Sequence, residues 1–102
     1  MVITVFISTS AVADEASSIF ACRDWIKLLI KIDDGVLTMG EVRSEVKALY
    51  EGNARLSHPP IRNATRGLLR ALTTGTDKDQ GNAVRALTAA CKEVIRRNPS
   101  RF

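Results

Sequence analysis

Residues 13–32 have the sequence ADEASSIFACRDWIKLLIKI, and their pattern determines the fold class. Their apolar side chains recur at steps of three and four residues, which is the period of an α-helix. They cover a wide part of the helix circumference, so the helix should be central and packed by neighbours on more than one side. Asp33, Asp34 and Gly35 have the composition of a turn. The stretch therefore predicts a long central helix in an all-α domain.

Capping signals and apolar spacing predict three more helices. Thr38 and Glu41 have the spacing of a capping box, in which each side chain accepts a hydrogen bond from the other residue's backbone N–H. Pro59 and Pro60 suit a helix start, because the first N–H groups of a helix have no intrahelical partner. We expect a four-helix bundle or an orthogonal helical domain, with helices at about 13–32, 38–52, 59–75 and 77–97.

The length of the chain, 102 residues, fits one hydrophobic core, so residues 1–102 should form a single domain. Its apolar start, residues 2–7, is rich in β-branched side chains and is compatible with a strand, a helix extension or an arm on a second subunit. Together with the wide apolar stripe of residues 13–32, this short N-terminal arm suggests a homodimer.

Two features bear on the compartment. The start Met1–Ile7 superficially resembles a signal peptide, but no basic segment precedes the apolar run, which stops at Ser8. Cys22 and Cys91 lie far apart in predicted helices, which favours two buried thiols over a disulfide. We therefore expect a cytoplasmic or nuclear protein that is not secreted. No apolar run approaches the roughly 18 residues of a membrane span, so we expect no membrane partner.

The charge is divided unevenly along the chain. Residues 1–52 carry five basic and eight acidic side chains, whereas residues 53–102 carry ten basic and three acidic ones. The net charge of +4 therefore conceals a strongly basic C-terminal half. Such an imbalance favours a polyanionic partner.

The basic side chains form two rows at helical spacing. One row follows the third predicted helix at four-residue steps, and the other follows the face of the fourth helix opposite its apolar residues. If the turn at Gly75 folds these helices into a hairpin, the rows could form one positive track along a nucleic acid. The candidate nucleic-acid-binding residues are Arg62, Arg66, Arg70, Lys78, Arg85, Lys92 and Arg96.

The predicted function is non-enzymatic binding of duplex RNA or DNA without base specificity. Of the five aromatic residues only Phe102 lies near the basic segment, which argues against base stacking and for contacts with the duplex backbone. This plan is similar to that of small viral and phage accessory proteins that sequester duplex RNA, although no family motif is present. A helix-turn-helix that presents Lys78 and Arg85 to a major groove ranks lower, because Asp77 and Asp79 would repel phosphates there.

The alternative is a protein–protein interaction module of the inhibitor or immunity type that docks an acidic partner. Catalysis has little support, because adjacent Ser57 and His58 seldom face each other in an extended loop and no acidic residue nearby in sequence orients the histidine. One histidine and two distant cysteines do not make a zinc site. We therefore expect no catalytic residue, no metal and no cofactor.

Overall fold

The regular secondary structure of residues 2–102 is entirely helical. The computed structural model describes the backbone of residues 2–102 and the side chains of residues 14–102. The elements are α1 (Val2–Asp33), α2 (Met39–Gly52), α3 (Pro59–Thr74), α4 (Asp77–Arg97) and two short 3-10 helices, Ala54–Leu56 and Pro99–Arg101. Residues 2–102 contain no strand. The all-α prediction is confirmed.

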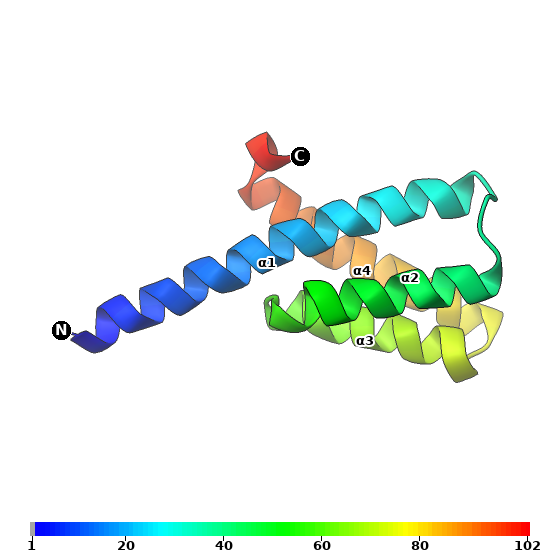
Figure 1. Cartoon of the computed structure of the whole chain (residues 1–102), viewed down its shortest axis with the longest axis horizontal. Coiled ribbons are helices and arrows are strands. Elements are labelled where there is room, and N and C mark those ends of the chain that lie inside the picture. The colour runs from blue at the N-terminus through cyan, green and yellow to red at the C-terminus, as the bar shows by residue number, and fades with distance from the viewer. Residues whose placement is uncertain (1) are drawn as a thin grey trace.

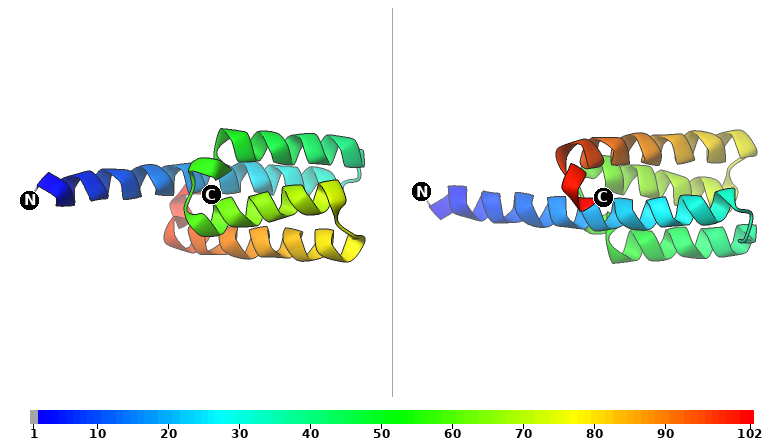
Figure 2. Two further views of the ribbon diagram at one scale, coloured as in Figure 1. Left: turned by 90° about the horizontal axis from the view of Figure 1, so that it is seen from below. Right: turned by 90° about the horizontal axis from the view of Figure 1, so that it is seen from above.

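The four helices form a bundle in which each helix is antiparallel to the next helix in the chain (Figure 1). α2 packs against α1 and α3, and α4 packs against α3 and α1. Short connections leave each helix beside the previous one, which produces a bundle rather than an orthogonal arrangement (Figure 2). The basic C-terminal half therefore supplies two adjacent helices, α3 and α4.

The core contains the apolar residues that the helical period predicts. Trp25 of α1 is 1% exposed and lies in one cluster with Val46, Ile61, Leu68 and Leu87 from the other three helices. The indole Nε1–H of Trp25 donates a hydrogen bond to Thr88 Oγ1, so its polar atom is satisfied inside the interface. Trp25 is therefore a core residue that ties α1 to α4.

A disulfide joins Cys22 of α1 to Cys91 of α4. The prediction of two free thiols is wrong, although both sulfur-bearing residues are buried as expected. Antiparallel packing of α1 on α4 brings the two Cα atoms within 5.5 Å of each other, which is inside the range a disulfide spans. The separation of 69 residues along the chain hides this proximity from a reading of the sequence.

The predicted helix ends are mostly confirmed. Thr38 and Glu41 form the expected capping box at the start of α2. Gly35 has φ of +69°, the left-handed conformation that suits a glycine in the turn after α1. At the start of α4 the cap is Thr76, which forms a second capping box with Asp79, so Asp77 lies in the first turn. The cap at Thr76 was not among the predicted helix starts.

α1 is longer than predicted, because its backbone remains helical back to Val2. Its 32 residues give a length of about 48 Å, against about 31 Å for α4 at 1.5 Å per residue. The extra turns project past the other three helices (Figures 1 and 2). The apolar start is therefore a helix extension, and its side chains lie outside the described residues. None of the helices within residues 2–102 combines the length and apolar content needed to cross a membrane.

Candidate functional site

The exposed face of α4 carries a straight row of cations. Lys78, Arg85, Lys92 and Arg96 all have exposed side chains. At about 100° per residue they lie within about 40° of one another around the helix axis, opposite buried Leu87, and the row spans about 27 Å. The amphipathic pattern of α4 alone fixes this arrangement, because burying Leu87 turns the row toward solvent. We call these four residues the α4 row.

Most of the α4 row is free of carboxylate partners. Among the described side chains, Lys78, Arg85 and Lys92 form no ion pair, and Arg85 Nη2 donates a hydrogen bond to the neutral Asn82 Oδ1 at 2.6 Å. Arg96 differs, because its Nη2 lies 2.8 Å from Glu93 Oε2. The hydrogen bond from Arg96 lowers the pKa of Glu93. Three full positive charges of the row therefore face solvent.

The three arginines of α3 follow at four-residue steps and span an arc of about 80° around that helix. Arg66 Nη2 donates a hydrogen bond to Tyr50 Oη of α2 at 3.1 Å, and its guanidinium carbon lies 5.9 Å from the centre of the tyrosine ring. Arg62 lies one turn before Arg66, at the other end of the arc from Arg70. Arg70, one turn after Arg66, lines a groove between α3 and α4. Arg66 therefore contacts α2, and Arg70 lies beside α4.

The groove between α3 and α4 is largely uncharged. Besides Arg70 its only charged lining residue is Asp79, and its remaining lining residues are small or polar ones such as Asn63, Gly67 and Asn82. Around the axis of α4, the α4 row lies about 100° from the centre of the residues of α4 that line this groove. Of the seven predicted residues, four therefore form the α4 row, Arg70 lies beside the groove, and Arg66 contacts α2. A single track along both helices stays a prediction.

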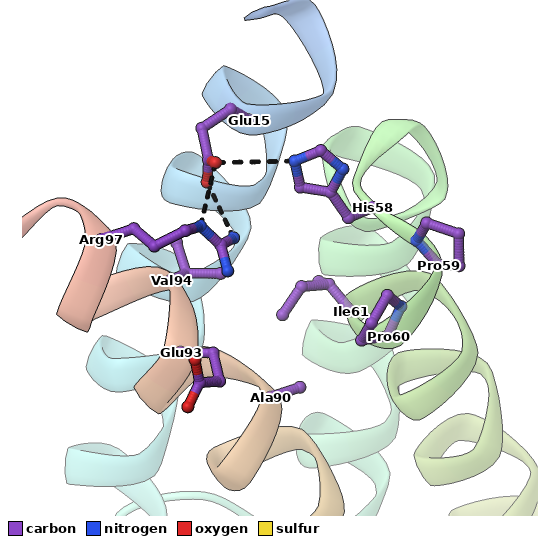
Figure 3. A pocket seen from close by; sticks show the side chains of 9 residues that line it. All are labelled: Glu15, His58, Pro59, Pro60, Ile61, Ala90, Glu93, Val94 and Arg97. Carbon is purple, nitrogen blue, oxygen red and sulfur yellow. Dashed lines mark hydrogen bonds and ion pairs between the residues drawn. The ribbon is translucent and has the colours of Figure 1, made fainter. Parts of the chain in front are cut away.

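A pocket of about 520 Å³ lies at the opposite end of the bundle from the α1–α2 turn, between α1, α4 and the start of α3 (Figure 3). Pro59, Pro60 and Ile61 form one apolar wall, and Ala90 and Val94 of α4 form another. Charged side chains stand at its edge. Figure 3 shows Glu15, His58 and Arg97 turned toward one another there.

Glu15 is the centre of this charged cluster. Its carboxylate accepts hydrogen bonds from Arg97 Nε at 3.1 Å and from Arg97 Nη2 at 3.0 Å. The Asn98 Nδ2 group donates a further one at 3.3 Å, and His58 Nε2 lies 3.7 Å from Glu15 Oε2. The hydrogen bond from Arg97 lowers the pKa of Glu15, and the same bond raises the pKa of Arg97. The cluster joins α1, the start of α3 and the end of α4.

Ser57 and His58 do not form a nucleophile and base. Ser57 is 2% exposed and its hydroxyl donates to the backbone carbonyl of Asn53 at 2.9 Å. The His58 backbone N–H donates to Ser18 Oγ at 3.1 Å, which fixes the loop on α1. The histidine does have a carboxylate neighbour, Glu15, which was not predictable because 43 residues separate the two along the chain. No group of three or more metal-binding side chains occurs among the residues that the structure describes.

Comparison with known proteins identifies no relative: no family model, curated protein or solved structure matches the chain.

Proposed function

We propose that the protein is a non-enzymatic binding domain that holds duplex nucleic acid through the α4 row. The observation that supports this is the row itself: three exposed cations without a carboxylate partner among the described side chains, aligned with Arg96 on one helix face. Cations in a line of this kind contact successive phosphates and release counterions, which supplies affinity without reading the bases.

The dimensions of the row fit a duplex backbone. Its length of about 27 Å corresponds to about eight base-pair steps at 3.4 Å per step. Arg70 lies on the neighbouring helix beside the groove and adds a cation to one side of the row. Arg66 is held by Tyr50 of α2, so it contributes to the general positive field rather than to contacts. The sequence of α4 itself contains no aromatic residue, which favours duplex over single strands.

The test is an electrophoretic mobility shift with random duplex RNA, duplex DNA and single strands of equal length. The double variant Arg85→Glu, Lys92→Glu should abolish retardation of the duplexes. The matched control is Lys27→Glu, Lys47→Glu, which changes the net charge equally at exposed positions of α1 and α2. Equal losses in both double variants, or no retardation of either duplex by the unaltered protein, would overturn the proposal.

A second candidate function is docking of an acidic protein partner, and the disulfide favours it. Buried disulfides are typical of domains that work outside the reducing cytosol, where protein partners are commoner than free nucleic acid. The α4 row would serve here as the rim of an interface. A screen that finds no duplex binding but finds a salt-sensitive complex with an acidic protein would select this function.

We also propose a homodimer, now on a smaller surface than the sequence suggested. Most of the apolar stripe of α1 is used inside the bundle, but Phe20 is 47% exposed and Ile30 is 57% exposed. Two copies that pair along this side of α1 would cover both side chains. Sedimentation equilibrium should show a dimer that Phe20→Glu dissociates, and a monomer at high micromolar concentration would exclude it.

A further inference from the structure

The pocket beside the Glu15 cluster contains no residue of the α4 row, so the proposed duplex contacts leave it unused (Figure 3). Its volume of about 520 Å³ lies within the roughly 300–1,000 Å³ of pockets that hold small molecules. Two of its lining side chains belong to the core, since Ile61 is 1% exposed and Val94 is 2% exposed. The pocket therefore reaches from the surface to the hydrophobic interior of the bundle.

The walls of the pocket are held apart. Pro59 and Pro60 form one wall, and neither side chain can rotate into the space, because each is closed in a ring on its own backbone. The loop before them is fixed on α1, where the His58 backbone N–H donates a hydrogen bond to Ser18 Oγ at 3.1 Å. On the opposite wall the side chain of Ala90 is too short to fill the gap. The pocket is therefore largely preformed, as ligand pockets usually are.

Both carboxylates at the pocket already have cationic partners. Glu15 accepts three hydrogen bonds, two from Arg97 and one from Asn98. Glu93 Oε2 lies 2.8 Å from Arg96 Nη2. A cationic ligand would have to displace one of these arginines, so a positive charge on the ligand gains little here.

The pocket does not attract an anion either. The two prolines that begin α3 have no N–H, and the Ile61 N–H donates to the His58 carbonyl oxygen at 3.0 Å. The positive charge of Arg97 is opposed by Glu15, which it binds, and by Glu93, which lines the same pocket. With ions of either sign disfavoured, the pocket is best suited to a neutral molecule.

One polar group at the pocket remains available to such a ligand. The guanidinium of Arg97 uses Nε and Nη2 on Glu15, and Nη1 donates to no atom of the described residues. Figure 3 shows the third nitrogen of Arg97 below the two that bond to Glu15, on the side of Ile61. The pocket thus combines apolar walls with a hydrogen-bond donor at its edge, and the group that an N–H recognises on a neutral molecule is an acceptor such as a carbonyl oxygen.

We propose that this pocket binds a small neutral molecule with an apolar body and a carbonyl oxygen. The apolar body lies between the wall of Pro59 and Pro60 and the wall of Ala90, where it displaces water from apolar surface. The carbonyl oxygen accepts a hydrogen bond from Arg97 Nη1, which orients the ligand. The proposal does not rest on duplex binding, because the α4 row lies on another face of the helix.

The test uses prodan, a neutral naphthalene ketone whose emission shifts to the blue when water is excluded. Titration with the full chain should show one saturable site with blue-shifted emission. Nuclear magnetic resonance should show that prodan shifts the methyl signals of Ile61, Ala90 and Val94. The methyl signals of Ala83 and Ala86, in the groove between α3 and α4, should stay in place.

Two variants test the walls of the pocket. Ala90→Phe should abolish prodan binding, because the ring fills the space in front of the proline wall. The matched control Ala89→Phe adds the same ring at an exposed position of α4 outside the pocket and should bind prodan normally. Circular dichroism of both variants shows whether the bundle is intact, and the resonance shifts of the unaltered protein locate the ligand without any substitution.

The hydrogen bond to the carbonyl group has its own test. Arg97→Lys keeps a positive charge beside Glu15 but removes the second free edge of the guanidinium. It should weaken prodan binding about tenfold, as expected for one hydrogen bond to a charged group. Binding of dimethylaminonaphthalene, which lacks the ketone, should not change. An equal loss for both compounds would contradict the contact with Arg97.

Three other results would reject the pocket as a small-molecule site. One is prodan fluorescence that does not saturate. Another is a set of shifted methyl signals in the groove between α3 and α4 instead of the pocket. The third is shifts of Ile61, Ala90 and Val94 by an apolar peptide but not by prodan, since the pocket would then belong to an interface with a protein.

Discussion

Trp25 of α1 and Thr88 of α4 are joined by a hydrogen bond of 3.2 Å across the interface that also holds the disulfide. Cys22 precedes Trp25 by three residues, and Cys91 follows Thr88 by three residues. The Trp25–Thr88 and Cys22–Cys91 contacts therefore lie about one helical turn apart along the same antiparallel pair of helices. The same interface ends at Glu15, so a hydrogen bond, a covalent bond and an ion pair all depend on one alignment of the first and last helices.

Replacing Glu15 by glutamine should lower the free energy of unfolding by about 1 kcal/mol at neutral pH, because Arg97 loses its partly exposed carboxylate partner. The pKa of Glu15 is lowered in the folded state from its ordinary 4.5, so its contribution is complete above that value. It is lost as the pH falls from 4.5 through the folded-state pKa. Urea unfolding of both proteins at several pH values measures this difference.

The control for that experiment is Glu45→Gln, which changes an exposed carboxylate that forms no ion pair among the described side chains. A stability difference for Glu15→Gln that persists unchanged at pH 2 would contradict the ion-pair explanation.

Reducing the disulfide should lower the free energy of unfolding by about 2–4 kcal/mol, because the cross-link closes a long loop and so restricts the unfolded chain. The residues that it joins are 69 positions apart. Urea unfolding with and without a thiol reductant measures the change. The double variant Cys22→Ala, Cys91→Ala should be destabilised and indifferent to the reductant, and identical midpoints for the oxidised and reduced protein would refute the prediction.

The helices were predictable and the contacts between them were not. Apolar period and capping pairs such as Thr38 with Glu41 are local, so the sequence carries them directly. The Cys22–Cys91 bond and the pairing of Glu15 with Arg97 depend on the register of α1 against α4, which two segments far apart in the chain set together. The register cannot be predicted from the sequence of either segment alone.

The α4 row was likewise predictable from one helix, whereas its relation to α3 was not. Small residues of α3, Ala64, Gly67 and Ala71, line the groove on the α4 side. Burial of Ile61, Leu68 and Leu72 sets the rotation of α3 about its axis. That rotation directs Arg66 toward Tyr50 of α2 and away from the row. Whether the two rows form one surface therefore depends on the packing of α3 against α4, which neither local pattern contains.

Gly75→Ala and Gly67→Ala should change stability in opposite directions. A Cβ at Gly75 would lie 2.8 Å from the Ala71 carbonyl oxygen, and this backbone clash should cost about 1–3 kcal/mol. A Cβ at Gly67 meets nothing within 4 Å, and alanine there should stabilise helix α3 by about 0.5–1 kcal/mol. Thermal unfolding of the two variants measures both effects. Stabilisation by Gly75→Ala would show that the α3–α4 turn is looser than described.

Duplex binding through the α4 row should weaken with salt in proportion to the cations that contact phosphate. Four contacts predict a slope of about −3.6 in a plot of log K against log salt concentration. Lys78→Gln should reduce the magnitude of that slope by about 0.9, whereas Lys47→Gln on α2 should leave it unchanged. Fluorescence anisotropy with a labelled duplex at several salt concentrations measures both. Equal slopes for the two variants would place the binding surface elsewhere.

The disulfide turns most of the chain into a closed ring, from Cys22 round to Cys91. All three connections between the helices lie inside it. A protease that cuts one of these connections therefore opens the ring without releasing a fragment, and the two pieces stay covalently attached and able to reassemble around the same core. Only a second cut, or a reductant, would set a helix free, so a singly nicked molecule should persist in an environment rich in proteases.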